Sequence, residues 1–143
     1  MALKLNPYLN FDGNAAEAFN FYKSVFGGEF AGGITKMGAA PGAENIAEEE
    51  KNRVMHVSLP LGNGQTLMAS DIVPSMGHKL NAGNNVYLSL HPDTREEADR
   101  LFNALAEGGK VEMPMEDQFW GDYFGSLVDQ FGIGWMVNYN PNF

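Results

Sequence analysis

The chain has 143 residues, no cysteine and a formal net charge of −9, from 18 acidic against 9 basic residues. A chain of this length buries roughly 70% of the surface that it exposes when unfolded, so we expect a single domain over residues 1–143. The absence of cysteine excludes disulfides, thiolate nucleophiles and cysteine-based metal sites, and it fits a reducing compartment. The negative charge, which no cluster of Lys and Arg reverses, argues against a nucleic-acid partner.

The sequence also lacks the apolar segments that a membrane protein needs. No stretch of about 18 consecutive apolar residues could cross a bilayer, and the first residues contain no apolar run of signal-peptide length. We therefore expect a cytoplasmic protein with no membrane partner.

In chain order, the first half predicts a strand, a helix and three further strands. Strands alternate apolar and polar residues because successive side chains point to opposite faces of a sheet. This pattern predicts strands near 4–11, 29–37, 53–61 and 65–71. A helix over 14–26 is predicted by apolar residues at helical spacing, namely Ala18, Phe21, Tyr22 and Val25.

Two segments break this pattern. Residues 38–52 combine Gly, Pro and an acidic run, so they cannot bury much surface and we expect a mobile surface loop. Residues 72–83 connect the two halves of the chain. Either segment could fold over a cleft or remain a solvated loop.

The second half repeats the order of the first. Strands are predicted near 84–91, 110–117, 121–129 and 134–140, with a helix over 94–107. Its apolar residues lie 80 positions after those of the first helix, at Ala98, Leu101, Phe102 and Leu105. Each helix opens with a potential capping pair, Asn14 with Glu17 and Thr94 with Glu97. We expect two βαβββ modules, at about 4–71 and 84–140, and duplicated modules tend to build one cleft between them.

Alternation also assigns the two faces of each sheet. The apolar sets expected to pack on the helices are Leu5, Leu9 and Phe11; Met55, Val57 and Leu59; Val86, Leu88 and Leu90; and Trp135, Val137 and Tyr139. The opposite faces mix Tyr, Met, Asn and His, which is typical of a ligand surface, although a solvated sheet face remains the alternative. The residues expected to line a ligand site are Tyr8, Asn10, His56, Met68, Ser70, Tyr87, Met136 and Asn138, with Trp120 and Phe124 at its rim or wall.

Three motifs carry a family resemblance that covers nearly the whole chain. They are YLNFDGNAAEA at 8–18, MASD at 68–71, and FWG at 119–121 followed by DQFGIGW at 129–135. Together they resemble the PhnB-like branch of the vicinal oxygen chelate superfamily, which includes glyoxalase I, extradiol dioxygenases and bleomycin-resistance proteins. The resemblance implies the α+β glyoxalase/bleomycin resistance/dioxygenase fold, in which two βαβββ modules form a curved mixed β-sheet cleft, usually in a homodimer.

The resemblance also bears on metal binding. Metal-dependent members of the superfamily take four ligands, mostly His and Glu, from the first, fourth, fifth and eighth strands, and these positions correspond here to Asn6, Met68, Asn85 and Met136. Two neutral amides and two thioethers do not suit Mg, Mn, Fe or Zn. A register shift of one residue would bring in Ser70, Asp71 or Asn138, still without two His and a carboxylate. We therefore expect no metal and no cofactor.

Few other residues could carry chemistry. His56 could act as a general base or a hydrogen-bond donor to a ligand, or bond only to a neighbouring backbone, whereas His78 and His91 are expected in a loop and a turn. Carboxylates are available at Asp71, Glu112, Glu116, Asp122 and Asp129. Of these, Asp129 is expected to order the turn at Gly132 before the last strand. Neither GxGxxG nor GxxxxGK followed by Ser or Thr is present, which argues against a nucleotide cofactor and against the dinucleotide-type fold that many methyltransferases use.

The sequence therefore predicts a protein that binds an unknown small organic molecule in a concave cleft, without the metal of the superfamily. Two alternatives remain open. The chain could be a metal-dependent lyase, dioxygenase or transferase whose metal ligands do not lie at the four positions inferred from the resemblance. It could also be a non-enzymatic protein that sequesters a bulky cationic drug, with which the charge of −9 is compatible.

Overall fold

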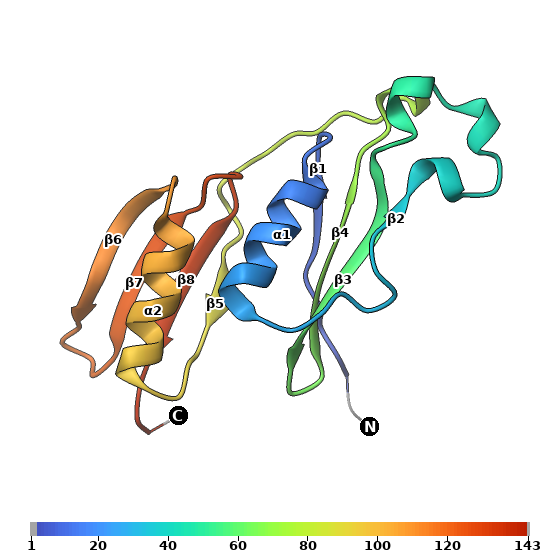
Figure 1. Cartoon of the computed structure of the whole chain (residues 1–143). Coiled ribbons are helices and arrows are strands. Elements are labelled where there is room, and N and C mark those ends of the chain that lie inside the picture. Colours follow the sequence, from blue (N-terminus) through green and yellow to red (C-terminus); the bar gives the residue numbers. More distant parts are fainter. Residues whose placement is uncertain (1–2, 143) are drawn as a thin grey trace. The chain divides into compact units, whose positions relative to one another are not determined.

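The computed structural model describes residues 3–142, within which the chain forms two α-helices and eight strands (Figure 1). The chain divides into two compact units, of which the first runs to Asn81 and the second begins at Ala82. Each unit contains one helix and one four-stranded sheet in the predicted βαβββ order. The α+β class and the repeated module are therefore confirmed. Neither helix is long and apolar enough to span a bilayer, within the part of the chain that the structure describes.

The first unit is a mixed sheet with one helix packed on it. Its elements are β1 (Tyr8–Phe11), α1 (Ala15–Phe26), β2 (Thr35–Lys36), β3 (Val54–Gly62) and β4 (Gln65–Asp71). The strand order is β1-β4-β3-β2; β1 is parallel to β4, and the other pairs are antiparallel. Figure 1 shows α1 lying along one face of this sheet. The opposite face of the sheet is not covered by this helix.

The core of the first unit lies between α1 and the sheet. The apolar residues buried there are Phe11, Ala15, Ala18, Phe19, Tyr22, Val25, Val57, Leu59, Leu67 and Ala69. The predicted helix face was wrong at one position, because Phe21 is only half-buried whereas Phe19 is fully buried. The Phe19 ring packs edge-on against Phe11 and Tyr22, with ring centroids 6.4 and 5.4 Å away, and this places it at the centre of the core.

Two strands of the first unit are shorter than predicted. The first begins only at Tyr8, after Pro7, which has no N–H to donate to a neighbouring strand. Leu5, predicted to be in the core, is therefore 90% exposed. The second strand contains only Thr35–Lys36 instead of 29–37, because Gly32 and Gly33 adopt φ of 74° and 71°, a conformation that breaks an extended strand.

The predicted surface loop at 38–52 is more structured than expected. It forms short 3₁₀ turns, namely η1 (Met37–Ala39), η2 (Ala43–Asn45) and η3 (Glu48–Glu50), and the connection after β4 contains a fourth, η4 (Pro74–Met76). The expectation that this acidic segment buries little was wrong for Glu50, which is only 5% exposed. Its carboxylate accepts hydrogen bonds from the backbone N–H and the hydroxyl of Ser75. These bonds join two segments that are 25 residues apart.

The second unit has the same topology as the first. Its elements are β5 (Leu88–Leu90), α2 (Arg95–Ala106), β6 (Lys110–Asp117), β7 (Tyr123–Val128) and β8 (Gly134–Tyr139). The strand order β5-β8-β7-β6 corresponds strand for strand to that of the first sheet, and β5 is parallel to β8. The buried face of α2 is the predicted one, consisting of Ala98, Leu101, Phe102 and Leu105. The first strand is shorter than the predicted 84–91, and Val86, predicted to be in the core, is 72% exposed.

The two helices are capped in different ways. In α2, Thr94 Oγ1 accepts a hydrogen bond from the backbone N–H of Glu97 at 3.1 Å, as the capping pair predicts. In α1, the side chain of Asn14 makes no capping bond, so this part of the prediction was wrong. The capping group of α1 is instead the Asp71 carboxylate, which comes from the end of β4.

Candidate functional site

One face of the first sheet gathers polar and methionine side chains, all but one of which were predicted as ligand-binding residues; the exception is Ser58. On β3, His56 and Ser58 alternate with the buried residues Val57 and Leu59, so they lie on the face opposite α1. The strand ladders pair Tyr8 with Met68, Asn10 with Ser70, and Ser58 with Met68, which places these residues on the same face. We refer to this surface as the open face, and its residues are Tyr8, Asn10, His56, Ser58, Met68 and Ser70.

A line of hydrogen bonds crosses the open face. The Tyr8 hydroxyl lies 3.3 Å from His56 Nδ1, and His56 Nε2 lies 2.9 Å from Ser58 Oγ. A neutral imidazole donates from one nitrogen and accepts at the other. When Nε2 carries the proton, it donates to Ser58, and the Ser58 hydroxyl can donate its own proton to another acceptor. When Nδ1 carries the proton, it donates to Tyr8, and the Tyr8 hydroxyl can donate to another acceptor. In either tautomer this chain of groups leaves one hydroxyl able to donate to a bound molecule.

The remaining residues of the open face add both polar and apolar contact surface. Ser70 Oγ lies 3.5 Å from Asn10 Oδ1, at the limit of a hydrogen bond. Tyr8 is 45% exposed, so its ring and hydroxyl are accessible. Met68 lies in the ladder between Tyr8 and Ser58 and supplies a flexible, polarizable apolar contact.

The second sheet has a corresponding face with fewer exposed polar groups. Its ladders pair Ser89 and Ser126 with Met136, and Phe124 with Asn138. Asn138 is only 8% exposed, and its Oδ1 has no hydrogen-bond partner within residues 3–142. The Asn138 amide therefore offers a buried acceptor oxygen on this face.

The other residues predicted for the site in the second unit make specific contacts of their own. The Asp122 carboxylate accepts from Asn140 Nδ2 at 2.6 Å and from Trp120 Nε1 at 2.8 Å, and these bonds, with Asn140 contributing most, lower the Asp122 pKa. Trp120 itself is about half exposed. The Tyr87 hydroxyl donates to Glu112 Oε1 at 2.6 Å, and this bond raises the pKa of Tyr87.

The donors at the positions that the resemblance suggests for metal ligands do not fit a divalent metal ion. Asn6 Oδ1 already accepts a hydrogen bond from the backbone N–H of Thr66 at 2.9 Å. Met68 and Met136 offer thioethers, and Asn85 is an exposed neutral amide. Across residues 3–142, no three side chains of His, Asp or Glu lie close enough together to hold an ion.

Asp71 and Asp129, considered as possible catalytic groups, serve the backbone instead. Asp71 accepts from the N–H groups of Gly13 (2.9 Å), Ala15 (3.0 Å) and Val54 (2.8 Å). Because its carboxylate occupies the N-terminus of α1, that helix end is not available to an anionic ligand. The Asp129 carboxylate accepts from the N–H groups of Phe131 and Ile133 and from Trp135 Nε1, which confirms its predicted role in the turn.

The other two histidines also have local partners. His78 Nδ1 accepts a hydrogen bond from the N–H of Val73 at 3.1 Å, within the connection where a loop was predicted. His91 Nε2 lies 3.1 Å from Ser89 Oγ. Only His56 belongs to a chain of side chains on the open face.

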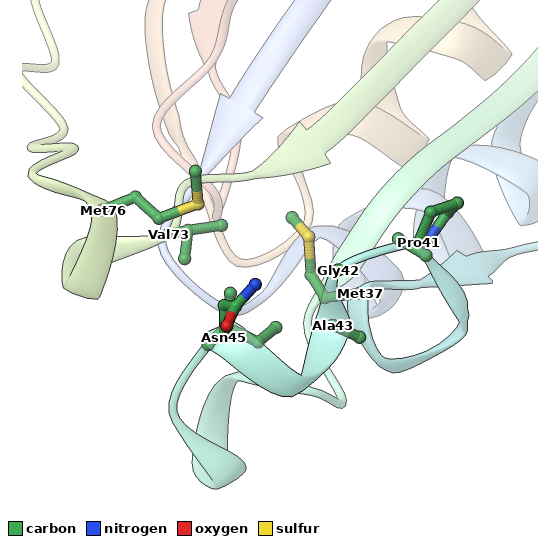
Figure 2. Close-up of a pocket in the computed structure, with 9 residues that line it drawn as sticks. Met37, Pro41, Gly42, Ala43, Asn45, Val73 and Met76 are labelled. Atoms are coloured by element: carbon green, nitrogen blue, oxygen red, sulfur yellow. The ribbon is translucent and has the colours of Figure 1, made fainter.

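The sequence did not predict a pocket beside the 3₁₀ turns of the first unit (Figure 2). Its walls include Met37, Ile46, Val73 and Met76, and its volume is about 290 Å³. The predicted elements did not indicate this pocket, because its lining residues lie in segments assigned to loops, apart from Met37, which was placed at the end of the predicted strand 29–37. The only available signal was the apolar residues within these otherwise polar segments.

Comparison with known proteins identifies the family. Residues 3–138 match the model of the family described as 3-demethylubiquinone-9 3-methyltransferase. The crystal structure of protein PA1353 from Pseudomonas aeruginosa is 40% identical and superposes with a TM-score of 0.85, over 97% of this chain and 98% of that one. A PhnB protein from Bacillus cereus, provisionally described as a 3-demethylubiquinone-9 3-methyltransferase, is 29% identical with a TM-score of 0.74, over 96% and 99% of the two chains.

A more distant likeness extends to the superfamily. A glyoxalase/bleomycin resistance protein from Albidiferax ferrireducens is 18% identical with a TM-score of 0.64, over 98% of this chain and 100% of that one. At this identity the likeness concerns the fold alone. The chain belongs to the PhnB-like family described as 3-demethylubiquinone-9 3-methyltransferase, and its fold is that of the glyoxalase/bleomycin resistance/dioxygenase superfamily.

Proposed function

We propose that this protein binds a small organic molecule on the open face of the first sheet, without a metal ion. The observation that carries the proposal is the hydrogen-bonded line Tyr8–His56–Ser58 on that face. An ordinary solvated sheet face carries separate Lys, Glu and Thr side chains in water. Here, aromatic, imidazole, hydroxyl and thioether groups adjoin one another, a mixture typical of ligand sites.

The chemistry of the open face favours a particular class of ligand. One hydroxyl of the line can donate in either His56 tautomer, so the ligand should offer an acceptor oxygen such as a carbonyl. Met68 is the ladder partner of both Tyr8 and Ser58, and it suits an apolar part of the same molecule. We therefore propose a small, mainly uncharged carbonyl compound with an apolar portion.

Methyl transfer, which the family description names, is not part of this proposal. Methyltransferases with a dinucleotide-type fold bind their cofactor where a Gly-rich turn leads from a strand of a parallel sheet into a helix. Both sheets of this chain are mixed, and the turn before α1 is closed by the Asp71 carboxylate. These features do not provide the site that such a methyltransferase uses for its cofactor.

We also propose that the protein forms a homodimer and is located in the cytoplasm. Several large apolar side chains are exposed in the second unit, namely Val86, Val111, Met113, Phe119 and Trp120. Burying them against a second copy would remove apolar surface from water. Light scattering at micromolar concentration should report about twice the chain mass of 15.7 kDa, and a persistent monomer would contradict the dimer.

The binding proposal can be tested by thermal unfolding against a defined panel of uncharged carbonyl metabolites in the presence of EDTA. A true ligand raises the melting temperature because it binds only the folded state. Ser58→Ala should raise the ligand concentration needed for the same rise in melting temperature about twofold to tenfold, as expected for one lost hydrogen bond. Ser24→Ala is the matched control, because Ser24 lies on α1 and its hydroxyl, within residues 3–142, bonds to the Phe21 carbonyl. An equal loss in both variants would refute the assignment to the open face.

A further inference from the structure

The pocket beside the 3₁₀ turns is separate from the open face. Its walls come from two segments of the first unit, one spanning η1 and η2 and the other containing Val73 and η4. None of the six open-face residues lines it. Figure 2 shows the Met37 and Met76 side chains extending toward the pocket from opposite sides, with Asn45 between them. A ligand here would therefore not compete with one on the open face.

The two walls are tied together by specific hydrogen bonds. Glu50, in η3 shortly after the first segment, accepts from both the N–H and the hydroxyl of Ser75 in the second. The backbone N–H groups of Met37 and Gly38 donate to the carbonyls of Arg53 and Lys51, which anchors the other end of the first segment. Because both walls are anchored, the pocket exists before any ligand arrives, and little ordering cost opposes binding.

The lining is apolar apart from one side-chain amide. Thioether and aliphatic groups of Met37, Ile46, Val73 and Met76 face the space, and thioethers make favourable contacts with aromatic rings. Asn45 lines the same space, and its amide makes no hydrogen bond with another side chain or backbone group within residues 3–142. One polar group in an apolar wall can fix the orientation of a bound molecule.

Charge around the pocket disfavours anions. Residues 37–52 contain four glutamates and one lysine, and that lysine, Lys51, is paired with Glu48. Glu44 lies directly between two lining residues, Ala43 and Asn45. A carboxylate placed in this apolar space would lose its hydration and face like charges, and both effects oppose binding.

We propose that this pocket is a second binding site, which takes a small uncharged aromatic molecule with one hydrogen-bonding group. A volume of about 290 Å³ lies just below the usual range for small-molecule sites, which suits one or two fused rings. The ring system would pack between the two thioethers, and the hydrogen-bonding group would pair with the Asn45 amide.

The experiment uses the full chain with ¹³C-methyl-labelled methionine, assigned through single Met→Leu variants. 2-Naphthol, which is uncharged at pH 7, and 2-naphthoate, which is an anion, are the probes, because they share one ring system. Saturable shifts of the Met37 and Met76 methyl signals with 2-naphthol are expected, while Met113 in β6 stays unchanged. 2-Naphthoate should bind at least tenfold more weakly.

Two variants locate the site. Ala43→Phe should block the pocket and abolish the shifts, whereas Ala39→Phe, at an exposed neighbour that does not line the pocket, should leave them intact. Asn45→Leu keeps the volume but removes the amide, so the dissociation constant for 2-naphthol should rise about twofold to tenfold. This second variant tests the proposal even if the bulky one unfolds.

Three results would overturn the proposal. One is the absence of any shift of Met37 and Met76 at millimolar 2-naphthol, or a shift of Met68 alone, which would place the probe on the open face. Another is equal affinity for the two probes. The third is a change of the Met37 and Met76 signals with protein concentration alone, which would identify a second copy of the chain as the occupant. Because Met68 reports on the open face, failure here leaves the proposed function untouched.

Discussion

The Asp71 carboxylate accepts a hydrogen bond from the backbone N–H of Ala15 at 3.0 Å, although the two residues are 56 positions apart. The same group also binds the N–H groups of Gly13 and Val54. One buried side chain at the end of β4 thus fixes the start of α1 and the start of β3. These two elements position the strands that carry the open face.

Replacing Asp71 should destabilise the fold strongly. In Asp71→Asn, one carboxylate oxygen becomes an NH₂ group that confronts N–H donors, so buried charge-assisted bonds are lost. We expect the free energy of unfolding in urea to fall by about 2–4 kcal/mol. The exposed Asp93→Asn serves as the control and should change it by less than about 0.5 kcal/mol. A similar small effect of both substitutions would contradict the capping role of Asp71.

The two helix caps should respond unequally to alanine. Thr94→Ala removes the bond to the Glu97 N–H and should cost about 1 kcal/mol of stability. Asn14→Ala removes no capping bond, so it should cost much less. Urea unfolding of both variants measures the difference. A larger loss for Asn14→Ala would mean that the sequence-based capping pair is correct after all.

Glu50 should contribute stability that depends on pH. The bonds from Ser75, above all from its hydroxyl, hold the Glu50 pKa below its ordinary value of 4.5. A group whose pKa falls on folding stabilises the folded state above its unfolded pKa, and this stabilisation is lost as pH falls through the folded pKa. The wild-type protein should therefore exceed Glu50→Gln in urea midpoint at pH 7, and the difference should shrink in acid below pH 4.5.

Glu49→Gln is the matched control for Glu50, because Glu49 lies in the same 3₁₀ turn and makes no side-chain hydrogen bond within the described residues. Its urea midpoint at pH 7 should equal that of the wild type. A difference between wild type and Glu50→Gln that is constant from pH 7 to pH 3 would rule out the carboxylate as the source.

Divalent metals should not stabilise the protein. Asn6 Oδ1 already accepts a hydrogen bond from Thr66, and the other donors at the positions that the resemblance suggests are thioethers and an amide. Added Ni, Mn, Zn or Mg should leave the melting temperature nearly unchanged, whereas a bound ion at 100 times its dissociation constant would stabilise by roughly 2.7 kcal/mol. A metal-dependent rise that His56→Ala abolishes would show that the open face is a metal site.

Strand alternation predicted the open face because its geometric basis is strict. Successive side chains of a strand point to opposite faces, so Tyr8 and Asn10, or His56 and Ser58, must share a side wherever the strand is regular. The sequence could not supply the pairing of β1 with β4, and this pairing brings Tyr8 beside Met68. The contact between Tyr8 and His56, which lie on different strands, likewise depends on the tertiary structure.

The predictions failed where tertiary structure overrides local pattern. Asn14 and Glu17 have the spacing of a capping pair, but the Asn14 side chain makes no capping bond, and the start of α1 is held instead by Asp71, which accepts from the N–H of Ala15. Leu5 and Val86 alternate correctly but lie outside the paired strands. The acidic segment at 38–52 was expected to bury little, because the partner of Glu50, Ser75, lies 25 residues away in the sequence and comes close only in the folded chain.

The most direct test of the proposed function is the Met68 methyl signal of ¹³C-methionine-labelled protein during titration with the carbonyl compound that stabilises it best. With EDTA present, we predict a saturable shift of Met68 that His56→Ala weakens or abolishes, since His56 orients the Tyr8 and Ser58 hydroxyls. A Met68 signal that does not move, or that moves only when a divalent metal is added, would contradict metal-free binding on the open face.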